Sequence, residues 1–104
     1  MKNIDNVIYK LNESIKNMFS DFKGVYLYGS YAKEKAKEYS DVDLVALFEK
    51  ELPREKRMEL WGLIGSFEAE LDIVFDFHPM TMEGLKKNPI YYNQVVNKGI
   101  YYGV

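Results

Sequence analysis

Two aspartates, Asp41 and Asp43, stand two residues apart at the start of an apolar segment that ends near Phe48. In an extended strand, residues two apart project from the same face, with Cα atoms roughly 7 Å apart. Both carboxylates can then converge on one or two cations. Carboxylate oxygens, with no Cys or His beside them, select hard ions such as Mg²⁺. The pair therefore predicts a magnesium site.

A Gly-Ser pair, Gly29 and Ser30, precedes these acids by ten residues. A glycine at the end of a strand lets the backbone approach a ligand closely, and the N-terminus of a following helix offers free N–H groups and a positive dipole end. Phosphate oxygens fit such a place. We expect Gly29 and Ser30 to contact phosphates. Lys33 is the one lysine of this segment that we name as a further phosphate contact. The lysines here alternate with Glu34 and Glu38, which is typical of a solvated helix face, so we name no other.

A third carboxylate from another strand usually completes a two-metal site. The segment 71 to 77 is expected to be a strand, and Asp72 is an acid within its apolar start, where a structural role alone would not favour one. We predict that Asp72 is the third ligand. Asp76, which would lie on the same strand face, is the competing candidate, although a position nearer the strand end favours solvation.

Other residues of chemical interest have more ordinary interpretations. His78, the only histidine, has no second ligand at a zinc-like spacing and is predicted to lie in a loop. Trp61 fits the apolar side of a helix and is predicted to be part of the core. A set of tyrosines could stack on a base, dock a partner or simply pack: Tyr91, Tyr92, Tyr101 and Tyr102.

The elements that must position these residues follow from hydrophobic periodicity. Helices are expected at residues 3 to 20, 31 to 38, 53 to 69 and 89 to 97, the last closed by Gly99. Strands are expected at 24 to 29, 41 to 48 and 71 to 77. This order predicts an α/β (α+β) fold, in which helices flank a small mixed sheet of three or four strands.

Size and composition limit the possible functions. The chain has 104 residues, 47% of them hydrophobic, which predicts a single domain over residues 1 to 104. The net charge is −2 with both signs interspersed, so a long nucleic acid is not expected as a partner. There is no cysteine, no apolar run long enough to cross a membrane and no signal peptide, so we expect a cytoplasmic protein without a disulfide framework.

Taken together, the Gly-Ser pair, the Asp-x-Asp pair ten residues later and the acid near a later strand resemble the polymerase-beta-like nucleotidyltransferase superfamily. The likeness is greatest to its minimal members, the antitoxins of HEPN/minimal-nucleotidyltransferase (MNT) toxin-antitoxin pairs. The resemblance implies the nucleotidyltransferase fold, a triphosphate held by Gly29 and Ser30, two Mg²⁺ ions held by Asp41 and Asp43, and Asp72 on the ion that activates the attacking hydroxyl.

The implied activity is transfer of AMP from ATP to a hydroxyl, a tyrosine of a cognate HEPN-type toxin. Family members often continue Gly-Ser-x-Ala with Arg-Gly, where this chain has Lys33 and Glu34. A point charge thus replaces a forked phosphate donor, and an acid is added beside the phosphates. A catalytically weak or inactive antitoxin that neutralises its partner by binding alone is the alternative. Small-molecule nucleotidyl transfer shares the motif but normally needs extra substrate-binding structure.

Overall fold

The computed structural model describes residues 3–37 and 40–104. Its helices and strands are interspersed along the chain, although no helix separates the first two strands. In chain order they are α1 (Ile4–Met18), β1 (Phe22–Tyr28), β2 (Val42–Phe48), α2 (Arg54–Leu71), β3 (Phe75–Met80), α3 (Met82–Lys86), α4 (Pro89–Tyr92), the π-helical turn η1 (Asn93–Asn97) and β4 (Ile100–Gly103).

The strands form one four-stranded sheet in the order β3-β2-β1-β4. β1 pairs antiparallel with both β2 and β4, and β2 pairs parallel with β3. The parallel pair is joined by α2, since a parallel connection needs a crossover. The expected mixed α/β architecture is confirmed, with the apolar tail after Gly99 supplying the fourth strand.

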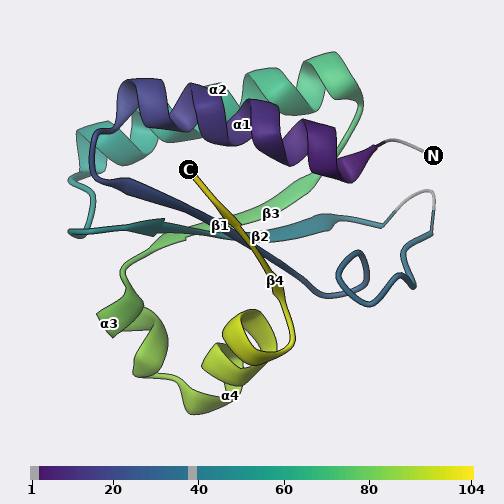
Figure 1. The fold of residues 1–104 in the computed structure, drawn as a ribbon. Helices are drawn as coiled ribbons and strands as arrows, with labels where there is room; N and C mark the ends of the chain where they lie inside the picture. The colour runs from purple at the N-terminus through teal and green to yellow at the C-terminus, as the bar shows by residue number, and fades with distance from the viewer. Residues whose placement is uncertain (1–2, 38–39) are drawn as a thin grey trace.

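Helices cover both faces of the sheet, α1 and α2 on one and α3 and α4 on the other (Figure 1). Strand residues alternate between two cores for this reason. Leu44 of β2 packs in the larger core with the buried stripe of α1, whereas its neighbour Val45 packs in a smaller core with Leu85 of α3 and Val95 of η1. Asp43 has the same strand parity as Val45, so its side chain belongs to the α3/α4 face.

The first long helix matches its prediction closely. α1 begins after Asn3, whose side-chain oxygen accepts the Asn6 N–H at 3.2 Å, and it buries Ile8, Leu11 and Ile15 completely. A polar side chain capping the first turn satisfies a backbone N–H that has no partner within the helix.

The second long helix departs from its prediction on its outer side. α2 buries Leu60 and Ile64 against the larger core, as expected. The prediction that Trp61 is a core residue is wrong: its side chain is 45% exposed and only meets the edge of the Phe77 ring, with centroids 5.8 Å apart. Met58, one turn earlier on the same helix, is likewise 62% exposed. Leu60 and Ile64 fill the core, so the side chains of Trp61 and Met58 are left in solvent.

The last helix is followed by a tight return to the sheet at Gly99. A Cβ atom at this position would collide with the backbone oxygens of Val95 and Leu27. Glycine is therefore needed for β4 to reach β1, where Ile100 pairs with Leu27. The expected helix over 89 to 97 is confirmed in outline, although its second half widens into a π-helical turn.

Candidate active site

Asp43 and Asp76 are brought side by side by the parallel pairing of β2 and β3, in which they are register partners. Asp76 is exposed and Asp43 is half-buried. The pKa of Asp43 is raised, first by burial and then by the charge of Asp76, a hydrogen bond to it and the charge of Asp41. The charge of His78 lowers this pKa, but by less than these causes raise it, so an ionised Asp43 is only partly compensated by positive charge.

Asp41 lies immediately before β2 and is exposed. Its charge also raises the pKa of Asp43, so the three acids Asp41, Asp43 and Asp76 form one electrostatic group. Within residues 3–37 and 40–104, no three metal-ligating side chains are close enough to hold an ion together. The donor set nevertheless fits a hard divalent cation, because carboxylates that repel one another are stabilised by such an ion. Rotation of exposed Asp41 and Asp76 would be needed to close the site.

Asp72 lies at the C-cap of α2 rather than on a strand. Its φ is 53°, in the left-handed region, and its N–H donates to the Glu68 carbonyl. The expected strand over 71 to 77 is therefore wrong at its start, since α2 extends to Leu71 and β3 begins at Phe75. Aspartate tolerates the left-handed conformation that ends a helix, which accounts for an acid at this point. Asp76, not Asp72, occupies the strand position opposite Asp43.

Gly29 directly follows Tyr28, the β1 residue that pairs with Asp43. Its φ is +73°, and a Cβ atom there would collide with Oδ2 of Asp43. Only glycine satisfies both the conformation and the space. The structure thus brings Gly29 against the carboxylate of Asp43, as the motif predicts for a shared site.

Residues 29 to 35 form a compact turn instead of the expected helix over 31 to 38. The Lys33 N–H donates to the Gly29 carbonyl at 3.2 Å, and the Lys35 N–H donates to the Ser30 carbonyl at 2.8 Å. Glu34 has a φ of 56°, a left-handed conformation that a helix cannot continue through. The prediction of a helix is wrong for the described part of this segment, and Glu38 lies outside the described residues.

The absence of a helix in residues 31–37 changes how phosphates could be bound. A helix dipole is not available there, so the N–H groups and side chains of the turn are the remaining donors. Lys33 is exposed in this turn, and Ser30 follows Gly29 directly. Glu34 occupies the place where family members often have glycine, and its positive φ gives the physical reason for that preference.

Two tyrosines that face the acids were not predicted as a pair. The hydroxyls of Tyr28 on β1 and Tyr91 on α4 are 2.7 Å apart. Burial is the largest cause of the raised pKa of each phenol, and the charges of Asp76 and Asp43 raise both further. The two phenols are therefore neutral at neutral pH and fasten α4 to the sheet beside the acids. Only strand parity could have indicated Tyr28, which shares a face with Asp43.

His78 lies on β3, so its predicted place in a loop is wrong. Its Nε2 is 2.9 Å from Oδ1 of Asp76, and its ring meets Tyr91 edge-on with centroids 6.4 Å apart. The other tyrosines have structural contacts elsewhere: Tyr102 donates to Asp5 and Tyr101 to the Lys23 carbonyl. Tyr91 alone of these is beside the acids.

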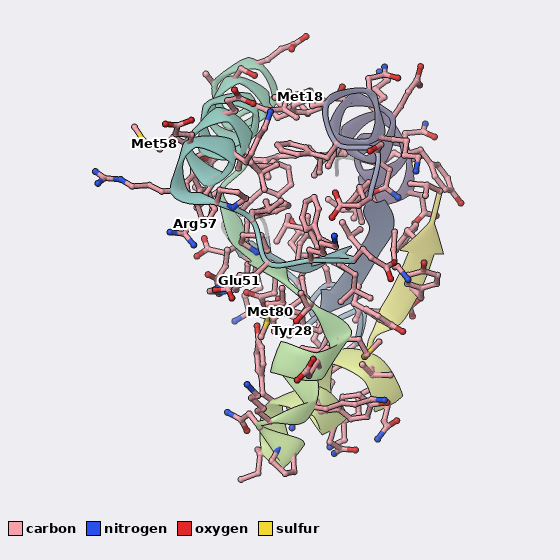
Figure 2. The ribbon with its side chains drawn as sticks, turned by 90° about the vertical axis from the view of Figure 1, so that its left-hand side faces the viewer. Met18, Tyr28, Glu51, Arg57, Met58 and Met80 are labelled. Atoms are coloured by element: carbon pink, nitrogen blue, oxygen red, sulfur yellow. The ribbon has the colours of Figure 1, made fainter. Side chains whose placement is uncertain are left out.

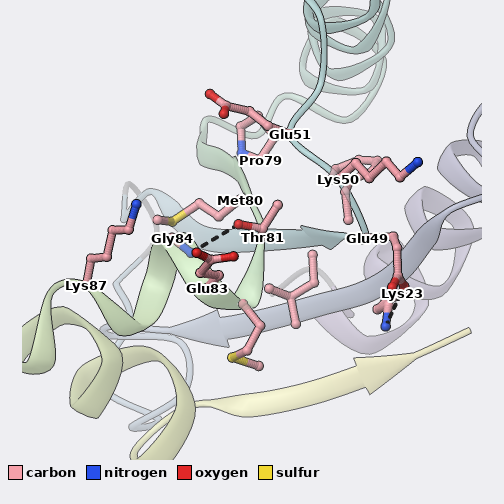
Figure 3. A pocket seen from close by; sticks show the side chains of 13 residues that line it. Lys23, Glu49, Lys50, Glu51, Pro79, Met80, Thr81, Glu83, Gly84 and Lys87 are labelled. Carbon is pink, nitrogen blue, oxygen red and sulfur yellow. Dashed lines mark hydrogen bonds and ion pairs between the residues drawn. The ribbon is translucent and has the colours of Figure 1, made fainter.

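A groove of about 870 Å³ lies at the ends of β2 and β3 that are away from these acids (Figure 3). Its walls include Glu49 and Lys50 after β2 and Thr81 and Gly84 near the start of α3. None of the acids discussed above lines it. The acids and this groove are thus at different ends of the strands.

Comparison with known proteins places this arrangement in a family. The family model described as polymerase beta, nucleotidyltransferase matches residues 10–99, most of the chain. The chain belongs to this nucleotidyltransferase family. A search of curated protein sequences finds no match. No helix in the described parts of this nucleotidyltransferase is long and apolar enough to cross a membrane.

Several solved structures share the fold. A toxin-antitoxin structure with AMP-PNP is 26% identical, with a TM-score of 0.68 over 95% of this chain and 73% of that one. A mutant of the toxin-antitoxin MntA-HpeT is 25% identical, with a TM-score of 0.66 over 98% and 72%. A chain from a structure of a tri-AMPylated Shewanella oneidensis HEPN toxin in complex with MNT antitoxin is 21% identical, with a TM-score of 0.64 over 96% of this chain and 72% of that one. The last likeness shows the fold alone.

Proposed function

We propose that this nucleotidyltransferase transfers AMP from ATP to a hydroxyl group, a tyrosine of a HEPN-type toxin, and thereby acts as an antitoxin. The register pairing of Asp43 with Asp76, beside a glycine that lies against the Asp43 carboxylate, carries the proposal. Family membership and likeness to a toxin-antitoxin with AMP-PNP support it.

In this proposal, Asp41, Asp43 and Asp76 hold two divalent cations, with Asp76 taking the place predicted for Asp72. Bound Mg²⁺ would offset the charge of the triphosphate and lower the pKa of the attacking hydroxyl. Gly29 leaves room for a phosphate close to the backbone, and Ser30 and Lys33 contact the triphosphate from the turn.

The transfer step forms one bond and breaks one. The tyrosine oxygen attacks the α-phosphorus of ATP, the bond from that phosphorus to the bridging oxygen breaks, and pyrophosphate leaves. The carboxylate of Asp76 accepts the hydroxyl proton, since it is exposed and lies beside Asp43 in the sheet. His78, paired with that carboxylate, holds it in orientation.

Binding without catalysis is the second candidate, and Glu34 is the observation that favours it. Its carboxylate stands in the phosphate-binding turn, in a backbone conformation that costs about 1–2 kcal/mol for a residue with a side chain. Like charge beside the triphosphate weakens its binding. An antitoxin of this kind would mask its toxin in stoichiometric amounts.

The test is intact mass and RNase activity of the partner toxin after incubation with this protein, ATP and Mg²⁺, followed by repurification. We expect the mass of one or more adenylyl groups and a toxin that stays inactive once separated. Asp76→Asn should lower the rate at least 100-fold, because the third carboxylate is lost, while Asp72→Asn should change it less than about threefold. Unmodified toxin with full recovery of activity would leave masking as the function. A rate lost only in Asp72→Asn would reject the assignment of Asp76.

A further inference from the structure

α2 has an unusual apolar surface on the side turned away from the core. Met58 is 62% exposed and Trp61 45% exposed, although each is a large apolar side chain. Figure 2 shows Met58 projecting away from the body of the molecule. Residues at spacings of three and four share a helix face. The outer α2 face is therefore made of five residues: Met58, Trp61, Gly62, Gly65 and Ala69.

The glycines of this face have no role within the monomer. A Cβ atom at Gly62 or Gly65 would meet nothing within 4 Å, and neither glycine has a positive φ. Each exposed glycine costs a helix about 1 kcal/mol relative to alanine. Small residues flanked by large apolar ones are useful where another helix approaches at an axial distance of about 8–10 Å.

The charges of α2 run opposite to what an isolated helix prefers. It begins with three bases in four residues and ends with three acids in the last four residues and the C-cap: Arg54, Lys56 and Arg57, then Glu68, Glu70 and Asp72. Acids stabilise helix N-termini and bases stabilise C-termini. A partner helix that runs antiparallel with the same charge pattern would compensate both ends.

We propose that the outer α2 face binds the same face of a second copy of this chain, with the two α2 helices antiparallel about a two-fold axis. This arrangement sets the large side chains near the start of one helix, Met58 and Trp61, against Gly65 and Ala69 near the end of the other. It also places the basic start of each helix beside the acidic end of its partner, and opposes the two helix dipoles. Shape and charge are thus self-complementary, as an isologous interface requires.

The size of the face sets the expected strength. α2 has 18 residues, about 27 Å of helix. One helix pair covers less than the roughly 800 Å² per partner of a standard stable interface. We therefore expect a dimer that forms at micromolar concentration and dissociates on dilution.

The experiment is sedimentation equilibrium of the whole chain over a concentration series, with fluorescence of Trp61 recorded on the same samples. The mass should rise from 12.2 kDa toward twice that value. Trp61 is the only tryptophan, so its emission should shift to shorter wavelength with the same concentration dependence, as its ring leaves water.

The variant Gly62→Gln/Gly65→Gln separates the interface from folding. Glutamine is a better helix former than glycine, so the dilute monomer should be as stable as the wild type or more so. The longer side chains should raise the dimer dissociation constant at least tenfold. Glu83→Gln, an exposed residue of α3 on the other face of the sheet, should leave it unchanged. A monomer at every concentration up to several hundred micromolar, or a dimer that the glycine changes do not weaken, would overturn the proposal; the first result would also leave the face to a partner protein.

Discussion

At the scale of single residues, Asp43 is the side chain on which the site depends, because burial, two neighbouring acids and a glycine all meet at its carboxylate. A structural aspartate would be paired with a base or with several N–H donors. Here burial and the neighbouring acids Asp76 and Asp41 raise the pKa of Asp43. The carboxylates of Asp41, Asp43 and Asp76 therefore repel one another in the folded protein, and a bound cation would reduce this repulsion.

The raised pKa of Asp43 gives a pH-dependent prediction. The folded protein binds its proton more tightly than the unfolded chain, whose value is near 3.8. Between the pKa of Asp43 in the unfolded chain and its pKa in the folded protein, the stability of the fold falls as pH rises. Above the folded pKa, the full cost of an ionised Asp43 is present. Asp43→Asn should therefore raise the melting temperature at pH 7 in EDTA, and the gain should shrink as the pH approaches 4. Thermal melts of both proteins across this range are the measurement; a gain independent of pH would contradict it.

Glu34 gives a prediction about backbone strain. Its left-handed conformation suits glycine, so Glu34→Gly should stabilise the fold by about 1 kcal/mol, offset in part by the greater freedom of glycine in the unfolded chain. The same change removes an acid from the phosphate-binding turn and should strengthen ATP binding. Urea unfolding and ATP titration measure the two effects, with Glu34→Ala as the control that removes the charge but keeps the strain. Equal stability of the glycine and alanine variants would show that the turn is unstrained.

At the scale of secondary-structure elements, the site is made by strand register and by one helix fastened over it. β1 supplies Tyr28 and then Gly29, β2 supplies Asp43, and β3 supplies Asp76. α4 contributes Tyr91, whose hydroxyl meets that of Tyr28. α4 and β1 are therefore linked by one side-chain hydrogen bond and by the edge-to-face contact of the same two rings, whose centroids are 5.7 Å apart.

A double-mutant cycle tests this link. Tyr91→Phe leaves the Tyr28 hydroxyl without its partner, and Tyr28→Phe does the converse, so each should cost about 1–2 kcal/mol. The double variant should cost less than the sum by roughly 0.5–1.5 kcal/mol, because neither hydroxyl is then left unpaired. Tyr92→Phe is the matched control on the same helix. Additive losses measured by chemical denaturation would mean that the two hydroxyls do not interact.

At the scale of the whole molecule, we expect cation binding to be coupled to folding, because Asp43 and Asp76 lie side by side only when β2 and β3 are paired in register. Mg²⁺ at roughly ten times its dissociation constant should stabilise the protein by about 1.4 kcal/mol, or about 6 °C in melting temperature. Asp41→Asn/Asp43→Asn should abolish this response. Asp21→Asn, directly before β1 and at the end of that strand away from Gly29, should keep it. An equal response in wild type and double variant, by calorimetry, would remove the metal site.

The sequence by itself determined the elements whose periodicity is strong and the motif whose spacing is local. The apolar stripe of α1, the alternation of β2 and the pairing of Gly29 with the later acids could all be predicted, since each depends on contacts within a strand, a helix or one hairpin. The turn after Gly29 could not, because lysine, glutamate and alanine favour a helix that the chain, returning to Asp41 within ten residues, does not form.

Only the tertiary structure decided which later acid lies opposite Asp43 in the sheet. Asp72 and Asp76 are four residues apart in similar apolar surroundings, and the choice depends on where α2 ends and β3 begins. The C-cap at Asp72 and the hydrogen bond from the Phe75 N–H to Glu68, 2.9 Å long, fix that boundary. Register between strands joined by a long crossover is set by packing of the whole sheet rather than by local sequence, and so Asp76 rather than Asp72 lies opposite Asp43.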